Sequence, residues 1–304
     1  MSWPCFARRC RSAIRRAGAA GLLLAPVLGL AQDAQEEINK QIAKLTSDAI
    51  SARLVGVQAG VLRAAGAAAA QKPNNAWGSY TNFRLKFSSD MDDGFGGSVR
   101  SSDSFTTDVG VLGYDRDLSR DTTVGVALDT AKTRHESGNS WGLSPYLAYR
   151  FSEHYFAIAK FRYGRFEGGG AKADSYSLGG SLNTVQPFGD WTFRGEAGLA
   201  TTHTKTRIDL PPLSSRESDN VWSWNLNGQG DYRFGDGWMA FAGLSANGSD
   251  ESHSTSLSAS AGVEKAFNTD GAVQLKYETK VADNLQAGTD IKTRAVTVSL
   301  RWRF

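Results

Sequence analysis

Apolar and polar residues alternate along most of this chain, from Trp77 to its last residue. The final stretch, VTVSLRWRF, shows the pattern well: Val298, Leu300, Trp302 and Phe304 occupy every second position, with threonine, serine and arginine between them. Successive side chains of a β-strand point to opposite faces, so this alternation produces one apolar and one polar face. No stretch beyond Trp77 has the period of an amphipathic helix. The pattern therefore predicts an all-β domain.

We count about twelve alternating segments in this domain. They cover residues 75–87, 104–118, 122–134, 140–151, 155–166, 174–188, 191–208, 221–234, 238–249, 253–267, 272–282 and 290–304. The faces of the second and tenth segments are ambiguous, and Phe156 and Ile158 interrupt the pattern of the fifth.

The connections between the segments alternate in length. Tight turns are predicted at residues 119–121, 152–154, 189–190, 235–237 and 268–270, and longer loops at 89–103, 167–173 and 211–220. Short turns at one rim and longer loops at the other are typical of a transmembrane β-barrel.

The composition of the two faces favours such a barrel over a soluble β-sandwich. A sandwich core would be rich in Ile, Leu and Val, whereas many of the polar faces here carry several charges together with Gly and Ser. Aromatic residues gather at segment ends, mostly at the short-turn rim, as in an interfacial girdle: Tyr114, Phe151, Tyr155, Phe188, Trp191, Tyr232, Phe234, Trp238 and Phe304. We predict an antiparallel barrel over residues 74–304, closed by pairing of the first and last strands, because unpaired backbone groups in hydrocarbon are costly.

One long α-helix is predicted before the barrel, within residues 32–73. Residues 33–72 are dense in helix-forming residues, with Ile38, Ile42 and Leu45 at helical spacing and acidic residues in the first turns. The sequence Lys-Pro-Asn-Asn at 72–75 ends it.

Residues 1–31 have the features of a secretory signal peptide. Five arginines precede an apolar run that is too short to span about 30 Å of hydrocarbon as a helix. We expect cleavage between Ala31 and Gln32. The leader holds both cysteines and five of the 34 basic residues but no acidic ones, so the formal charge of the remaining chain is −2 rather than +3. Without a basic run or a thiol, that chain is expected to have no nucleic-acid partner, no Cys chemistry and no disulfide.

The ending LRWRF resembles the terminal signal of outer-membrane barrels, which the barrel assembly machinery reads. That resemblance assigns an assembly signal to Val298, Leu300, Trp302 and Phe304. A free, alternating last strand is suited to strand addition by another protein. The same aromatic residues could equally serve as interfacial anchors, and both roles are compatible.

Together, residues 33–304 resemble the translocator domain of classical autotransporters, in which a helix threads the pore of a twelve-stranded barrel that ends in Phe. The helix, NNAWGSYTNFRLKF, VGVLGYDRDLSRDTTVGVALDTAKTR and LRWRF carry the likeness. It implies a pore lined by Arg150, Lys160, Arg162, Arg194, Glu196, Asp231, Arg233, Lys276, Glu278, Arg301 and Arg303.

The chain departs from that family in two respects. Some members cut their own passenger at an Asn pair inside the helix, whereas this helix has only Asn39 and the pair Asn74-Asn75 lies beyond it, so we expect no self-cleavage. Only a few residues separate Gln32 from the helix, so we also expect no passenger in this chain.

We therefore expect a translocator or pore domain, plugged by its helix, in the outer membrane of a Gram-negative cell. The expected partners are outer-membrane lipid and lipopolysaccharide, the Sec export and barrel assembly machineries and periplasmic chaperones, and we expect a monomer. The alternatives are a porin-like channel for small solutes, a surface adhesin and an outer-membrane hydrolase. For a hydrolase, His203 with Asp209, or Asp90, Asp92 and Asp93 near the first outer loop, could activate a water, and His253 with Ser254 could suggest a lipase-like nucleophile. Their spacing supports no catalytic arrangement, so we expect no enzyme, cofactor or metal.

Overall fold

The structure, a computed structural model, describes residues 38, 41–54, 73–92, 98–134, 138–168, 171–210, 213–250, 254–268, 270–283 and 289–304. The chain forms two compact units, Met1–Lys44 and Leu45–Phe304. In the first unit the described residues, 38 and 41–44, are helical. In the second unit, residues 45–54 are helical and precede twelve β-strands.

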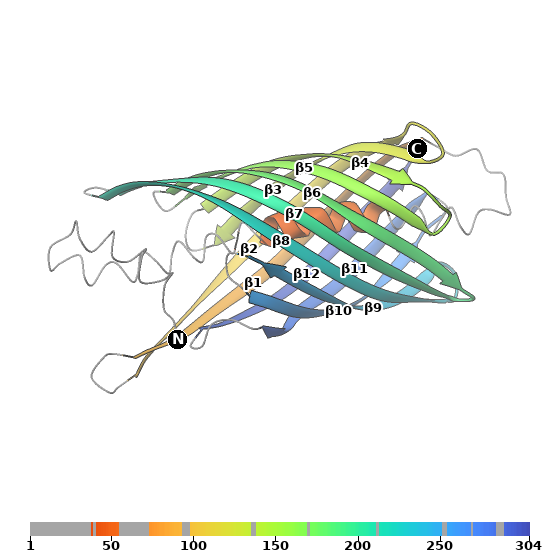
Figure 1. Cartoon of the computed structure of the whole chain (residues 1–304). Coiled ribbons are helices and arrows are strands. Elements are labelled where there is room, and N and C mark those ends of the chain that lie inside the picture. The colour runs from red at the N-terminus through yellow and green to blue at the C-terminus, as the bar shows by residue number, and fades with distance from the viewer. Residues whose placement is uncertain are drawn as a thin grey trace. The chain divides into compact units, whose positions relative to one another are not determined.

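The twelve strands form one closed antiparallel barrel (Figure 1). They are β1 (Asn74–Asp92), β2 (Ser98–Asp117), β3 (Thr122–Arg134), β4 (Gly138–Arg150), β5 (Tyr155–Gly168), β6 (Ala171–Phe188), β7 (Trp191–Leu210), β8 (Leu213–Phe234), β9 (Trp238–Ser249), β10 (Ser254–Ala266), β11 (Gly271–Asp283) and β12 (Thr289–Arg303). Each strand pairs with its neighbour in sequence, and β1 pairs with β12 from Asn75↔Arg303 to Ser89↔Thr289. The predicted fold, including closure through the first and last strands, is confirmed.

The predicted tight turns are also confirmed. They join the strands at what we call the short-turn rim, where β1 begins and β12 ends. Gly189, Gly235 and Gly237 have positive φ angles of 60°, 61° and 73°, which glycine adopts without a Cβ clash. In the turn after β2, the Ser119 hydroxyl accepts hydrogen bonds from the backbone N–H groups of Asp121 and Thr122.

The prediction of longer loops at the opposite rim is wrong over much of their length. β1 continues to Asp92, β2 begins at Ser98 and β8 begins at Leu213, so residues expected in loops are paired, as at Ser88↔Ser102. Backbone pairing needs a neighbouring strand but no apolar face. Polar segments therefore extend the ladders beyond the alternating stretches that identify the strands in the sequence.

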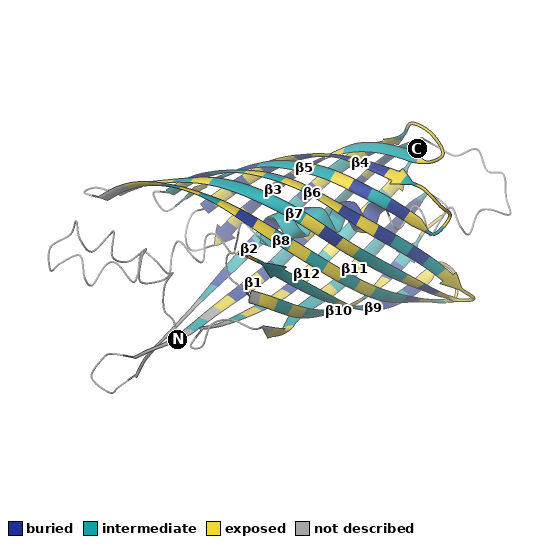
Figure 2. Ribbon diagram, viewed as in Figure 1, coloured by how far each residue is buried: buried dark blue, intermediate teal, exposed yellow. Residues whose placement is uncertain are grey.

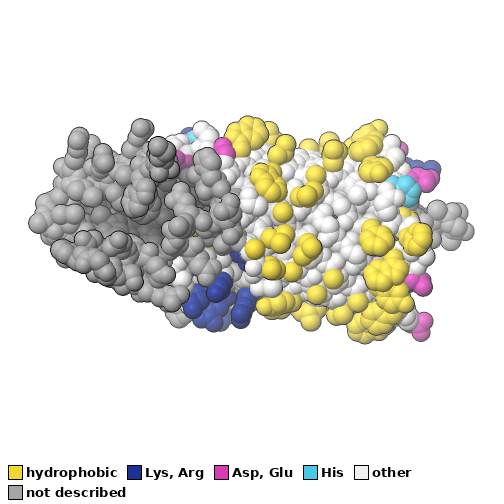
Figure 3. All heavy atoms as spheres, turned by 60° about the horizontal axis from the view of Figure 1, so that its bottom comes forward, with side chains coloured by type: hydrophobic (Ala, Val, Ile, Leu, Met, Phe, Trp, Pro, Cys, Tyr) yellow, Lys and Arg dark blue, Asp and Glu magenta, His cyan; other side chains and the backbone are white. Residues whose placement is uncertain are grey.

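Burial alternates along the strands as the pattern predicts (Figure 2). In β4 the exposed and buried positions alternate from Gly138 to Tyr149. The outward face carries an apolar belt that includes Leu112, Leu128, Leu182, Leu199, Leu226, Leu244, Leu275 and Leu300, each at least 49% exposed. Outward aromatic residues flank this belt, with Phe188, Trp191, Phe234 and Trp302 near the short-turn rim and Trp141, Tyr176 and Trp222 farther from it. Figure 3 shows apolar side chains spread over one side of the barrel.

Two ladders of the barrel are irregular. The β4–β5 pairing passes from Leu143↔Tyr163 to Tyr146↔Lys160, leaving out Pro145, which has no N–H to donate. The β10–β11 pairing shifts register between Leu257 and Ser258.

The single helix predicted over residues 33–72 is confirmed at residues 38 and 41–54. The rest of that range, the signal peptide and the Ala31/Gln32 site lie outside the described residues. Among the described residues, no helix is both long and apolar enough to cross a bilayer.

Candidate functional site in the barrel lumen

Helix residues 45–54 lie in the barrel and bond to its inner wall at two heights (Figure 1). Lys160 donates a hydrogen bond to the Ser47 hydroxyl, and Arg53 donates one to Asp115. Lys160 is five residues from the start of β5, whereas Asp115 is only two residues from the end of β2, both measured from the short-turn rim. The helix therefore runs toward the short-turn rim, and β1 starts at that same rim and runs back.

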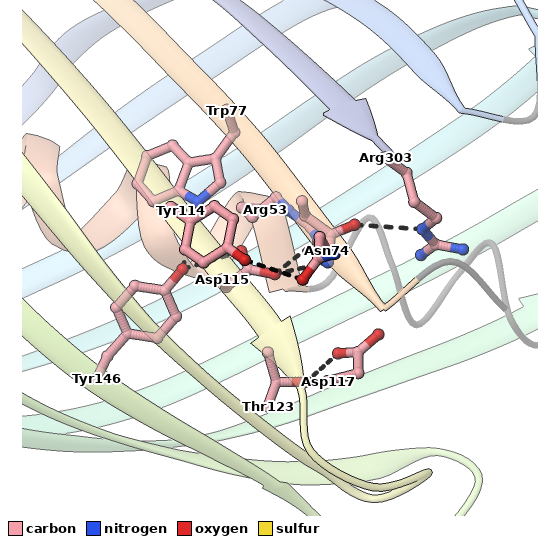
Figure 4. Close-up of polar contacts among 10 residues, drawn as sticks. Arg53, Asn74, Trp77, Tyr114, Asp115, Asp117, Thr123, Tyr146 and Arg303 are labelled. Atoms are coloured by element: carbon pink, nitrogen blue, oxygen red, sulfur yellow. Dashed lines mark hydrogen bonds and ion pairs between the residues drawn. The ribbon is translucent and has the colours of Figure 1, made fainter.

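Asp115 is the centre of the lower contact (Figure 4). Its side chain is 0% exposed, and that of Arg53 is 4% exposed. Asp115 Oδ1 accepts from Arg53 Nη2 at 2.9 Å and from Asn75 Nδ2 at 2.7 Å, and Oδ2 accepts from the Tyr146 hydroxyl at 3.0 Å. A buried charge is tolerated when it is paired and hydrogen-bonded, and this carboxylate has both. The helix is thus tied to β1, β2 and β4 through one side chain.

Two aromatic side chains extend the cluster along the wall. Trp77 Nε1 donates to the Tyr146 hydroxyl at 3.2 Å. Glycines opposite both rings leave the space: a Cβ on Gly113 would meet the Trp77 ring at 2.1 Å, and one on Gly125 would meet the Tyr146 ring at 2.3 Å. Arg303 completes the cluster by donating to Asn75 Oδ1 at 3.2 Å.

Farther around the wall, most inward charges have partners of opposite sign. The Arg162 guanidinium binds the Asp129 carboxylate at 3.0 and 2.8 Å in a two-point contact, and Arg194 Nε lies 2.5 Å from Asp231 Oδ2. Arg301 pairs with Glu264, and Lys276 Nζ lies 2.8 Å from Glu278 Oε2. Glu196 accepts from the Asn225 and Asn227 amides at 3.1 and 3.5 Å. Each of these ion pairs leaves little net charge at its position, and three of them, Arg162–Asp129, Arg194–Asp231 and Arg301–Glu264, connect different strands.

All eleven residues expected to line the pore alternate with outward residues and so lie on the inward face: Arg150, Lys160, Arg162, Arg194, Glu196, Asp231, Arg233, Lys276, Glu278, Arg301 and Arg303. Lys160 contacts the helix, and Arg303 belongs to the Asp115 cluster. Sequence reasoning did not single out Arg53, Asp115, Asp129 or Glu264. The available signal for Arg53 was its charge within a helix that contains many small residues. The signal for Asp115, Asp129 and Glu264 was an acidic residue at an inward strand position.

Part of the inner wall is apolar, which explains the ambiguous faces of the second segment and the interrupted pattern of the fifth. Phe156 and Ile158, the residues that interrupt the pattern of β5, point inward and are 1% and 2% exposed. Val109 and Val111 of β2 are equally buried, while Leu112 of the same strand faces outward. A side chain this buried does not face a water-filled bore, because something must cover it. Ile50 and Leu54 in the helix are also buried, at 1% and 4% exposed.

The last strand presents its alternate apolar side chains outward. Val298, Leu300, Trp302 and Phe304 are 43–54% exposed. Phe304 exchanges backbone hydrogen bonds with Asn74 at 2.9 and 3.3 Å, and its ring centroid lies 6.4 Å from that of Tyr114. The strand named as an assembly signal is therefore also the strand that closes the barrel.

The hydrolase candidates do not come together in the described part of the chain. His203 Nδ1 lies 2.8 Å from the Asn220 side-chain oxygen, a contact without a carboxylate, and the Asp115 and Asp129 carboxylates bind cations of the helix and the wall. His253 and Asp93 lie outside the described residues, as do the side chains of Asp90, Asp92 and Asp209. The described residues contain no group of three or more His, Cys, Asp or Glu residues that could hold a metal.

Comparison with solved structures identifies the fold. The β-domain of the Bordetella autotransporter BrkA matches with a TM-score of 0.58 and 15% identity, covering 76% of this chain and 100% of that one. The translocator domain of the autotransporter NalP from Neisseria meningitidis matches with a TM-score of 0.58 and 12% identity, covering 86% and 99%. An outer-membrane channel from Pseudomonas putida F1 matches with a TM-score of 0.50 and 14% identity, covering 79% and 98%. No protein-family model matches the sequence, and neither does any curated protein.

Proposed function

We propose that this protein is an outer-membrane β-barrel of the translocator type, and that its own helix closes its pore. The outward apolar belt between aromatic girdles suits a bilayer, and the barrel fold is shared with autotransporter translocator domains. Residues 1–31 would direct export to the periplasm, with cleavage between Ala31 and Gln32. The Sec machinery, periplasmic chaperones and the barrel assembly machinery are the partners that this route requires. The proposal includes no catalytic step, cofactor or metal.

The observation that carries the proposal is the buried Arg53–Asp115 bond, together with the direction of the helix. The described helix residues run toward the short-turn rim, and β1 starts at that rim and runs back along the wall. This is the geometry that a translocator requires, and it leaves the helix in the path of small solutes.

Single-channel recording in planar bilayers tests the closed pore. We expect the chain from Gln32 to conduct weakly and a variant lacking residues 33–72 to conduct at least several-fold more, because the helix no longer fills the bore. Heat-dependent mobility in gel electrophoresis checks that both proteins are folded barrels.

Crosslinking provides the control for helix position. A short bifunctional thiol reagent should join the pair Ser47→Cys and Lys160→Cys and hold the conductance at its low value. The pair Ser47→Cys and Ala159→Cys, whose second residue faces outward, should not be joined. Equal and high conductance with and without the helix would favour the porin-like channel instead.

A further inference from the structure

The outward face of the β1–β12 seam carries a concentrated positive charge. The register places Arg84 opposite Arg294 and Lys86 opposite Lys292. Directly opposed side chains on one face of an antiparallel pair have Cβ atoms only about 4.5–5.5 Å apart, and like charges at such positions are destabilising. Four cations therefore share a small surface, which we call the seam patch. An arrangement that costs stability in the empty protein points to a ligand that compensates for it.

Among the described side chains, neighbouring groups do little to neutralise three members of the seam patch, Arg84, Lys86 and Arg294. Arg84 donates to the neutral Ser104 hydroxyl at 3.3 Å, and among the described side chains Arg84, Lys86 and Arg294 form no ion pair. The nearest described carboxylate on this face, Asp108, already accepts from Arg134 at 2.8 and 3.2 Å and from Tyr80 at 2.6 Å. Because Arg134 and Asp108 offset one another, Asp108 does not neutralise the positive charges of Arg84, Lys86 and Arg294.

The height of the seam patch matches the edge of the apolar belt. Arg84 lies ten residues along β1 from Asn74, and Arg294 lies ten residues along β12 from Phe304. At about 3.3 Å per residue and a tilt of about 40°, ten residues rise about 25 Å, which is the height of the apolar band of a membrane barrel. The outward Val296 and Val298 belong to the belt directly below it. Figure 3 shows Lys and Arg side chains gathered at the margin of the apolar surface.

We propose that the seam patch binds the phosphate groups of lipopolysaccharide in the outer leaflet. Arginine pairs with phosphate through two parallel N–H···O bonds, and lysine adds point charge. The headgroup phosphates of this lipid would lie where its acyl chains end, so the chains would pack along Val296 and Val298 while the phosphates meet the four cations. The site rests on the membrane location in the proposed function but is independent of the closed pore.

Binding of purified lipopolysaccharide to the detergent-solubilised chain from Gln32 tests the site. The variant removes the seam patch by Arg84→Gln, Lys86→Gln, Lys292→Gln and Arg294→Gln. The matched control removes four exposed outward cations elsewhere by Arg116→Gln, Lys172→Gln, Lys205→Gln and Arg207→Gln. We expect the Kd for lipopolysaccharide to rise at least about tenfold in the variant and to stay within about twofold in the control. Native mass spectrometry reports the bound lipid, and heat-dependent gel mobility reports the fold.

Two ligand arms distinguish the lipid from free phosphate. Enzymatically dephosphorylated lipopolysaccharide should bind the unchanged protein as weakly as the intact lipid binds the seam-patch variant. Inorganic phosphate at millimolar concentration should displace little of the intact lipid, because it lacks the acyl chains. Complete displacement by phosphate, or equal affinity of the seam-patch variant and the unchanged protein, would overturn the assignment. If the unchanged protein proves to conduct in planar bilayers, the closed-pore proposal fails. Weaker binding of lipopolysaccharide by the seam-patch variant would still support this site.

Discussion

The buried ion pair Arg53–Asp115 is one of the contacts that connect the helix to the wall of the barrel. Such pairs contribute little net stability compared with an apolar contact, but removing one partner leaves an uncompensated buried charge. The pair therefore favours the position of the helix in which Arg53 reaches Asp115. The helix can leave its place only if Asp115 finds water or another cation.

Replacing Arg53 by Met should release the helix while the barrel stays folded. Breaking a buried pair from one side costs about 3–5 kcal/mol, which is enough to raise the open fraction of the pore at least about tenfold. Open probability in planar bilayers measures this effect. Arg303→Met is the matched control: among the described residues its side chain bonds to Asn75 in the same cluster and not to the helix, so it should change the open fraction much less. If Arg53→Met and Arg303→Met behave alike, the pair does not hold the helix.

The positions of inward charges could be predicted from the sequence, but their pairing could not. Alternation fixes the face of Arg162 or Arg194, because every second residue of a strand shares a side. Their partners, Asp129 and Asp231, lie on other strands, and the pairing depends on the register of the closed barrel. Asp115 was missed because β2 carries apolar residues on both faces, so the polar face of that segment was not distinct.

The strands themselves were predictable over most of their length. The bounds predicted for β3 and β9 coincide with the observed ones, since a tight turn precedes each strand and alternation runs to its end. The ends of β1, β2 and β8 at the opposite rim were not predictable from alternation, because no lipid selects an apolar face there.

The last strand allows a test of its two roles. Deleting Phe304 should lower the yield of inserted barrel in cells several-fold, because the terminal signal and one pair of backbone bonds to Asn74 are lost. Phe267→Ala removes an exposed aromatic residue from the same rim without changing the terminus. Heat-modifiable protein in outer-membrane fractions measures insertion. Equal losses in the two variants would mean that Phe304 serves only as an interfacial anchor.

The barrel as a whole separates an oily exterior from a charged interior, and adjacent residues of one strand test that separation. Leu244 faces outward and is 59% exposed, while its neighbour Ser245 faces inward. Leu244→Arg should cost about 2–4 kcal/mol of stability in a bilayer, and Ser245→Arg should cost less than about 1 kcal/mol. Urea titration of the protein folded in phospholipid vesicles measures both changes. Similar costs for the two substitutions would contradict a lipid-facing exterior.

The seam between β1 and β12 also imposes an order on biogenesis. The Thr81 and Thr297 hydroxyls, 216 positions apart in sequence, meet there at 2.9 Å. Contacts between residues so far apart in sequence form late in folding. The intervening chain must first lose conformational entropy, and only then do the contacts stabilise the barrel. Until they form, β1 and β12 are edge strands, and their unpaired backbone N–H and C=O groups can pair with any other chain in the periplasm. A requirement for escort before insertion thus follows from the topology itself.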